Sequence, residues 1–311
     1  RKTHAQQDGA CLLRPPAPQD GILSVLYAQQ VSCKLTREQA VLKHKKSRRR
    51  HTGPFRVIHE DEDIVVVDKD AGLLTVPIPK SNARNLKELL DRYLEKRRGR
   101  ALQVHRIDRY TSGLVVFARN PDARERLVTQ FRARTPERLY LAIVRGVVEA
   151  DKGTLRHQLD LTRDGFRQKV VPRGGTEAIT HFHVRERLAN LTIVEVRLET
   201  GLKNQIRVQF QAAGHPLMGD RHYEGAEAGE RLLSRQALHA WRLSFLHPRT
   251  GRTVGFESPL AADLAYLWNR MREPPPPPPP PPPVSKALPV APPVIVAPVL
   301  RVPDIEEPDT W

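Results

Sequence analysis

The stretch that decides the fold is Gln103–Asn120, which reads QVHRIDRYTSGLVVFARN. Its second half, Gly113–Ala118, is a continuous apolar run typical of a buried strand. The polar loop before it places Asp108 between Arg106 and Arg109. Because neighbouring cations favour the charged form of a carboxyl group, we expect Asp108 to be ionised and available as a nucleophile.

A purely structural role for Asp108 stays open at this point. Aspartates in turns often accept hydrogen bonds from backbone amides a few residues further on. The amides of Thr111 and Ser112 are the candidates here. One Asp-Arg pair does not decide between the two interpretations.

Outward from this loop, short apolar runs rich in β-branched residues predict strands. These runs cover Phe55–Ile58, Ile64–Val67, Gly113–Ala118, Leu139–Arg145, Glu177–Leu188, Leu191–Glu199, Leu238–Leu246 and Thr253–Glu257. Helical spacing of apolar residues predicts a helix over Asn85–Arg98, and Asn120-Pro121 predicts the start of another that runs towards Arg134. The mixture predicts an α+β fold with a large, mainly antiparallel sheet flanked by helices.

The charge is strongly positive and unevenly distributed. The 311 residues carry a formal net charge of +16, of which residues 1–53 hold +8 and residues 272–311 hold −2. Residues 54–271 therefore keep +10, which favours a polyanionic partner such as nucleic acid. We expect a basic N-terminal extension with no recognised module, one folded catalytic domain over 54–271, and a disordered tail built around Pro274–Pro283.

The sequence offers little support for a metal site or for a membrane-spanning helix. Cys11 and Cys33 lack the paired spacing of a zinc site, and so few cysteines favour a reducing, cytoplasmic setting. The apolar stretch Gly21–Val31 is shorter than the roughly 20 residues of a spanning helix. His181 and His183 share a strand face but lack a third ligand at convincing spacing. We expect no metal and no membrane segment.

Four segments together resemble one known family. HRIDRYTSGLVVFA (105–118) resembles the catalytic motif of the RluA-type RNA pseudouridine synthases. VIHEDEDIVVVDKDAGLLTVP (57–77) resembles the opening strand pair of that family, RLYLAIVRG (138–146) its tyrosine motif, and ETGLKNQIRVQFQAAGHPLMGDRHYEG (199–225) its arginine segment. The four segments follow the family's order and cover roughly residues 55–270.

This chain also departs from the family pattern at several positions. Asp70 stands where the family usually has proline, and Lys203-Asn204 stand where it often has Thr-His. Gln209 replaces a frequent second histidine. We expect positions 203, 204 and 209 to tune the choice of substrate.

The resemblance implies the fold of a pseudouridine synthase catalytic domain and three catalytic residues, Asp108, Tyr140 and Arg207. Asp108 would attack the anomeric carbon of the ribose or assist departure of the base. Tyr140 would lie against the target base and transfer a proton, and it shares a strand face with Arg138. Arg207 would hold Asp108 through a two-pronged contact from a segment that only the resemblance identifies as a helix.

The same resemblance implies contacts with RNA. A stacked uridine has to be flipped out of its helix before either reacting carbon is reachable. Arg106 resembles the arginine that fills the gap, although a plain phosphate contact remains the alternative. The other residues expected to bind RNA or assist flipping are His105, Arg109, Arg138 and Lys203.

The resulting hypothesis is a cytoplasmic, monomeric isomerase that acts on structured RNA without a cofactor. Large-subunit ribosomal RNA is the first substrate expected and transfer RNA the second. The alternatives are a non-catalytic RNA-binding or ribosome-assembly factor, which charge alone supports, and a glycosidase-like hydrolase. The hydrolase would need a second carboxylate in an equally specific motif.

Overall fold

The computed structural model describes residues 53–96, 99–165, 167–224 and 232–272. Both cysteines, the basic run at 43–50 and the proline run lie outside these residues, so the predictions made for them stay predictions. The same holds for the proposed division of the chain into three parts.

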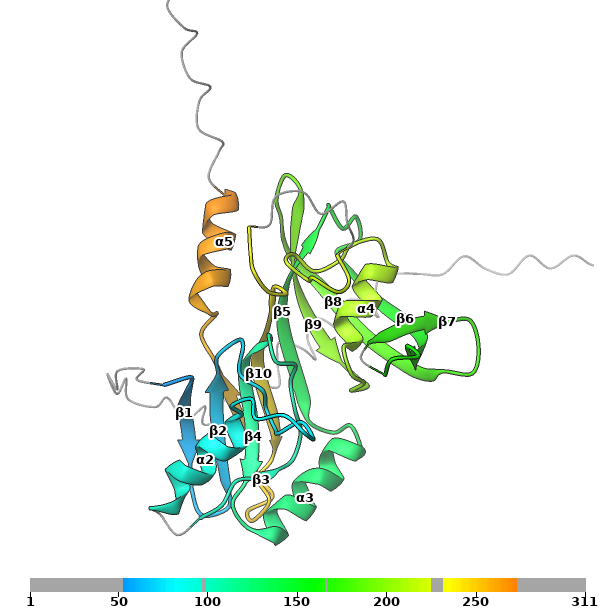
Figure 1. Ribbon diagram of the computed structural model, residues 1–311. Helices are drawn as coiled ribbons and strands as arrows, with labels where there is room; N and C mark the ends of the chain where they lie inside the picture. Colours follow the sequence, from blue (N-terminus) through cyan, green and yellow to red (C-terminus); the bar gives the residue numbers. More distant parts are fainter. Residues whose placement is uncertain (1–52, 97–98, 166, 225–231, 273–311) are drawn as a thin grey trace, which may run out of the picture. The chain divides into compact units, whose positions relative to one another are not determined.

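Eleven strands of the described chain form one sheet (Figure 1). Their order is β1-β2-β4-β10-β5-β9-β8-β6-β7, with β3 paired to β4 and β11 paired to β10. The strands are β1 (Phe55–Glu60), β2 (Ile64–Lys69), β3 (Leu102–Gln103), β4 (Ser112–Ala118), β5 (Glu137–Arg145), β6 (Lys152–Leu161), β7 (Gln168–Val171), β8 (Thr176–Arg187), β9 (Leu191–Leu198), β10 (Leu238–Leu246) and β11 (Thr253–Glu257). The described helices are α2 (Leu86–Glu95), α3 (Pro121–Arg132), α4 (Gln205–Ala212) and α5 (Ala262–Arg272). The pair of β4 and β10 is parallel, and the other strand pairs of the described sheet are antiparallel. The predicted α+β class with a mainly antiparallel sheet is therefore confirmed.

Strand β2 is buried on both faces, which explains its uninterrupted apolar sequence. Val65 and Val67 belong to the cluster that includes the leucines of α2 and two residues of α4. Ile64 and Val66 belong to a second cluster, which includes Leu127 of α3. Helices therefore cover both faces of this part of the sheet, and each buried aliphatic side chain contributes about 1.5–3 kcal/mol.

Side-chain caps begin both helices that the sequence predicts. The Asn85 Oδ1 accepts a hydrogen bond from the Glu88 amide at 3.0 Å, and the Asn120 Oδ1 accepts one from the Ala123 amide at 2.8 Å. The predicted starts are therefore confirmed, whereas α2 ends at Glu95 rather than at 98.

The sequence did not predict β6, β7 and α5. β6 contains mostly half-exposed and exposed residues, so the apolar signal of a buried strand is weak there. Its neighbour β7 has only four residues and none is buried. α5 buries only Leu264 and Leu267 among its eleven residues, which is a sparse helical stripe.

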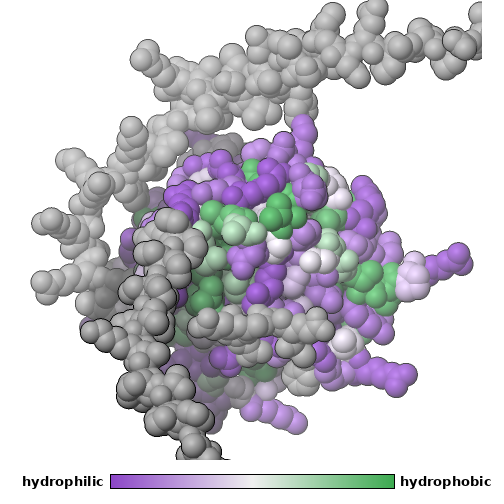
Figure 2. Space-filling model, turned by 90° about the horizontal axis from the view of Figure 1, so that it is seen from above, coloured by the Kyte–Doolittle hydropathy of each residue, from purple (hydrophilic) through white to green (hydrophobic). Residues whose placement is uncertain are grey.

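The surface visible in Figure 2 is mostly hydrophilic, and hydrophobic residues occur there in scattered groups. Large exposed apolar side chains of the described chain include Tyr110 of the β3–β4 loop, Leu161 of β6 and Tyr266 of α5. Among the described helices, none has the length and apolar character needed to cross a membrane.

Candidate active site

The loop between β3 and β4 carries Asp108, and buried cations fix its backbone. Nζ of Lys69, the last residue of β2, donates to the carbonyl oxygen of Arg109 at 3.1 Å. Nη1 of Arg235 donates to the carbonyl oxygen of Tyr110 at 3.2 Å. The residues that follow Asp108 are therefore held from the protein interior.

Lys69 is fully buried and satisfies its three donors with backbone oxygens. Besides the contact to the loop, its Nζ lies 2.9 Å from the carbonyl oxygens of Asp70 and of Leu73. Burial and the charge of Arg235 lower the pKa of Lys69 to about 7, against the opposing attraction of Asp108. Its role in the described fold is to anchor the loop.

Gly113, the first residue after Thr111-Ser112, allows β4 to lie beside β10. Its φ is +110°, and it pairs with Ala240 across the parallel contact. A Cβ at this position would lie 2.2 Å from the carbonyl oxygen of Ala240. Any other residue would push β4 away from β10 and displace the loop with it.

The carboxylate of Asp108 is held by one of its two oxygens. Oδ2 accepts hydrogen bonds from Nδ2 of Asn204 at 2.7 Å and from Nη1 of Arg207 at 3.2 Å. Oδ1 has no hydrogen-bond partner among the described residues, and the side chain is 22% exposed. The amide of Thr111 donates to the backbone carbonyl of Asp108 rather than to its carboxylate. The carboxylate is thus oriented, and one oxygen is free to react.

Arg207 is buried in α4 and connects two carboxylates. Its Nε and Nη2 donate to Asp220 at 2.6 and 2.8 Å, while only Nη1 reaches Asp108. The predicted two-pronged contact to Asp108 is therefore wrong, because the fork of the guanidinium is taken by Asp220. Burial would lower the pKa of Arg207, but the hydrogen bonds and charges of Asp220 and then Asp108 raise it above its usual value. The guanidinium also stacks over the ring of Tyr223 at 5.0 Å.

Asp108 and Arg207 line a cavity beside the loop. It is bounded by residues of the loop, β5, β9, α4 and β10 and of the segment that leads into α4. The charged and polar side chains at its wall are Arg106, Asp108, Thr111, Arg138, Tyr140, Asn204, Gln205 and Arg207. The expectation that Arg138 and Tyr140 point into one cleft is met by this lining. The cavity combines one carboxylate with three guanidinium groups, a combination suited to a polyanionic substrate.

Tyr140 is buried, and its hydroxyl makes no hydrogen bond to any residue that the structure describes. Burial raises the pKa of this hydroxyl above its usual value, helped by the negative charge of Asp108 and opposed by Arg138. The hydroxyl is therefore protonated at neutral pH and can donate a hydrogen bond into the cavity.

Three of the residues expected to bind RNA lie outside the cavity wall. His105 stacks on Phe131 with ring centroids 4.5 Å apart, and its Nε2 accepts from the amide of Val116 at 3.1 Å. Burial lowers the pKa of His105 to about 3, so the ring is neutral. Arg109 donates to the Gly72 carbonyl, and Lys203 donates to the carbonyl of Gly165. Arg106, by contrast, is exposed at the cavity wall.

Gln209 replaces a family histidine and is fully buried. Its Oε1 accepts from the hydroxyl of Thr180 at 2.6 Å, and its Nε2 donates to the carbonyls of Leu155 and Ala178 at 3.0 Å each. These contacts fasten α4 to β6 and β8. Gln209 is absent from the cavity wall, so its expected influence on substrate choice stays a prediction.

Two residues that shape the site have contacts that were not predicted. Asn204 was expected to tune the choice of substrate, yet its amide binds Asp108. Asp220 holds Arg207 and is fully buried. Its signal was an acidic residue directly after Gly219 within the recognised arginine segment, but the sequence does not show which cation faces it.

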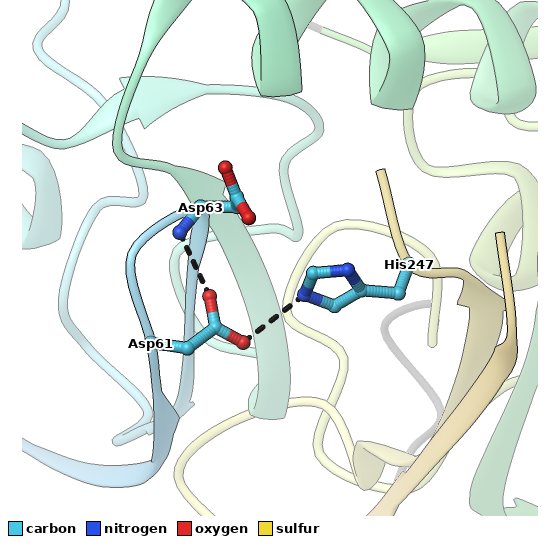
Figure 3. A group of neighbouring side chains, drawn as sticks. All are labelled: Asp61, Asp63 and His247. Carbon is cyan, nitrogen blue, oxygen red and sulfur yellow. Dashed lines mark hydrogen bonds and ion pairs between the residues drawn. The ribbon is translucent and has the colours of Figure 1, made fainter. Parts of the chain in front are cut away.

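A second group of side chains has the composition of a metal site. The ligand atoms of Asp61, Asp63 and His247 lie within 4.8 Å of one another (Figure 3). Oδ2 of Asp61 already contacts His59 and His247, at 2.7 and 3.1 Å. Both oxygens of Asp63 accept from Arg249, at 2.6 and 3.0 Å. Protein donors thus occupy the oxygens that a cation would need, which favours a role in joining β1-β2 to β10-β11.

His181, which the sequence places on one strand face with His183, contacts Thr154 and Glu199, each at 2.9 Å.

Solved structures resemble this fold. The human protein titled RNA Pseudouridylate Synthase Domain Containing 4 matches with a TM-score of 0.57 and 22% identity, over 70% of this chain and 92% of that one. The human protein titled RNA Pseudouridylate Synthase Domain Containing 1 matches with a TM-score of 0.56 and 23% identity, over 71% of this chain and 96% of that one. At this level of identity the match concerns the fold alone.

Sequence comparisons give closer relatives. Residues 63–212 match the family model described as RNA pseudouridylate synthase. "Uncharacterized RNA pseudouridine synthase YlyB" of Bacillus subtilis (strain 168) is 39% identical over 222 residues, which are 70% of this chain and 73% of that protein. "Ribosomal large subunit pseudouridine synthase D" of Neisseria meningitidis serogroup A is 40% identical over 228 residues. The match covers 70% of this chain but only 61% of that relative.

Proposed function

The chain belongs to the family of RNA pseudouridylate synthases, and from this membership we propose that it isomerises a uridine of large-subunit ribosomal RNA with Asp108 as nucleophile. The observation that carries the assignment of Asp108 is its geometry. Oδ2 is fixed by two donors, whereas Oδ1 has no partner among the described residues and belongs to a side chain that lines the cavity. A carboxylate that is held but not fully covered suits attack on an electrophilic carbon.

The proposed reaction rearranges bonds within one nucleotide. The bond between C1′ of the ribose and N1 of uracil breaks while the carboxylate of Asp108 attacks or stabilises C1′. The detached base turns, a bond forms between C1′ and C5, and any bond between Asp108 and C1′ breaks in the same step. C5 loses its proton and N1 gains one, so the atoms of the RNA balance without any external group. This balance is the reason that we propose no cofactor.

Tyr140 and Arg106 take complementary roles in this proposal. The ring of Tyr140 lies against the target base, and its hydroxyl relays the C5 proton by accepting it on oxygen while its own proton passes to solvent. Arg106 is exposed at the cavity wall, where a planar guanidinium can stack on neighbouring bases. It would occupy the space that the flipped uridine leaves, at a cost of a few kcal/mol for unstacking.

The substrate class rests on a relative. The Neisseria protein is named for the ribosomal large subunit, and it is 40% identical to this chain over the matched residues. Mapping pseudouridines in total RNA from cells with and without this protein tests the assignment. Loss of a site in large-subunit ribosomal RNA is expected, and loss only in transfer RNA would redirect the proposal.

Replacing Asp108 with Asn tests the nucleophile. The variant keeps the size of the side chain but removes the charge, so RNA should bind while no pseudouridine forms in a single-turnover assay with excess enzyme. Asp160→Asn, an exposed aspartate on β6, is the matched control and should keep the normal rate.

Activity assays on the variant and on the unaltered chain also distinguish the alternative functions. Asp108→Asn activity at about a tenth of the normal rate, with deamidation excluded by mass spectrometry, would remove Asp108 from the mechanism. Release of free uracil by the unaltered chain would indicate a hydrolase. RNA binding with neither product would indicate a non-catalytic factor.

A further inference from the structure

Asn204 has a backbone conformation that is uncommon for a residue other than glycine. It precedes α4 with φ +52° and ψ +19°, in the left-handed region, and its side chain makes no capping hydrogen bond to the helix. Asparagine at a helix start usually caps a backbone amide. Here the amide group instead turns to Oδ2 of Asp108, at 2.7 Å.

The other described residues with this conformation provide a comparison. Lys80 and Arg134 also have positive φ, but both are exposed residues in connecting segments. Asn204 is half-buried and lines the cavity. Non-glycine residues in the left-handed region are uncommon, and asparagine is among those that tolerate it best. The position therefore combines a constrained backbone with a functional contact.

Two donors on one oxygen fix the direction of the carboxylate. The amide of Asn204 and the guanidinium of Arg207 both bind Oδ2, from positions one helical turn apart in sequence. Arg207 supplies charge, but its fork is committed to Asp220. The shorter of the two contacts to Asp108 is the one from Asn204.

We propose, resting on the function proposed above, that Asn204 is a positioning residue: with Arg207 it holds Oδ2 of Asp108, so that Oδ1 is the oxygen presented to the ribose. The amide favours the ionised carboxylate, because a hydrogen bond donated to a charged acceptor is stronger than one donated to a neutral acceptor. It also limits rotation of the carboxylate about its Cβ–Cγ bond. A helix cap or a packing role would predict effects on folding but none on Asp108.

The charged and titratable groups around Asp108 come from several elements. They are Arg106 and Arg109 of its own loop, Lys69 of β2, Arg138 and Tyr140 of β5, Arg207 of α4, and Asp220 and Tyr223 beyond Arg207. None of them is altered in variants that change only Asn204. A spectroscopic change at the Asp108 carboxyl in such variants therefore reports on the loss of the Asn204 amide.

Two variants of the full chain test the proposal. Asn204→Gly accepts a positive φ without strain but removes the donor. Asn204→Asp keeps the shape and places a second carboxylate against Oδ2. The ¹³C chemical shift of the Asp108 carboxyl carbon in the free protein at neutral pH should differ from that of the unaltered chain in both variants, because Oδ2 loses the hydrogen bond from Asn204.

Single-turnover rates at saturating enzyme provide the second measurement. Asn204→Gly should be about tenfold slower with unchanged RNA affinity, because the carboxylate of Asp108 is less well oriented. Asn204→Asp should be slower still, because its carboxylate repels that of Asp108. Circular dichroism and melting temperature verify that both variants fold.

The two proposals can fail separately. An unchanged chemical shift of the Asp108 carboxyl carbon in both folded variants would overturn the role of Asn204, and so would an unchanged single-turnover rate. Absence of pseudouridine formation by the unaltered chain on any cellular RNA would overturn the proposed function instead. The NMR measurement needs no turnover and would still decide whether Asn204 controls Asp108.

Discussion

At the scale of single residues, the site is a series of linked charges that ends at Oδ1 of Asp108, which has no hydrogen-bond partner among the described residues. Asp220 holds the fork of Arg207, and Arg207 reaches Asp108 with its remaining nitrogen. Removing one partner of a buried ion pair typically costs about 3–5 kcal/mol, because the other charge is left without compensation. Asp220 therefore contributes to the site through Arg207, although its side chain is fully buried.

Tyr140 gives the prediction that belongs to this scale. Tyr140→Phe keeps the ring against the base and removes only the hydroxyl, so RNA binding should persist while single-turnover isomerisation slows by about a hundredfold. Tyr93→Phe is a matched control, since it removes a hydroxyl that bonds Glu60 outside the cavity. A normal rate for Tyr140→Phe would limit this residue to packing.

At the scale of elements, α4 shows why its sequence was ambiguous. All six residues from Gln205 to Phe210 are buried, so neither a helical nor a strand period separates an inner from an outer face. Gln209 and Gln205 satisfy their amides with groups of β8 and its neighbours instead of water. Only the family resemblance predicted a helix there.

Helix α2 gives a prediction about its cap. Asn85 is buried and caps the Glu88 amide, so Asn85→Ala should lower the free energy of unfolding by about 1 kcal/mol. Urea denaturation followed by circular dichroism measures the change. Asn85→Ser keeps a capping oxygen and should recover most of the loss. Equal stability of the Ala variant and the unaltered chain would contradict the assigned cap.

Burial on two faces explains why β2 and β4 were predicted, and its absence contributed to missing β6. β2 and β4 are enclosed between helices, and this requires continuous apolar runs that are easy to recognise. β6 is exposed to solvent along much of its length, so its sequence is too polar to show the apolar pattern of a buried strand. The site residues also fall into a predicted and an unpredicted group. The motifs predicted Asp108, Tyr140 and Arg207, which do line one cavity. The contact of Asn204 depends on how α4 meets the loop, which local sequence does not encode.

At the scale of the whole molecule, positive charge is spread beyond the cavity. Residues 54–271 carry a net charge of +10, and residues 1–53 add +8 without any catalytic motif. Charge of this kind attracts phosphates wherever they approach, whereas the cavity selects one nucleotide. Affinity and chemistry should therefore respond differently to salt and to truncation.

The affinity for RNA should fall steeply with salt. If only about three phosphates are contacted, the logarithm of the association constant falls with a slope of about −2 against that of the salt concentration. Fluorescence anisotropy with the inactive Asp108→Asn variant measures this slope without turnover, and a neutral solute at equal osmolality controls for water activity. Removing residues 1–53 should make the slope shallower and weaken binding, while the single-turnover rate at saturating enzyme stays the same. A flat salt dependence would contradict the phosphate contacts. A slope that the truncation leaves unchanged would place those contacts on residues 54–271 alone.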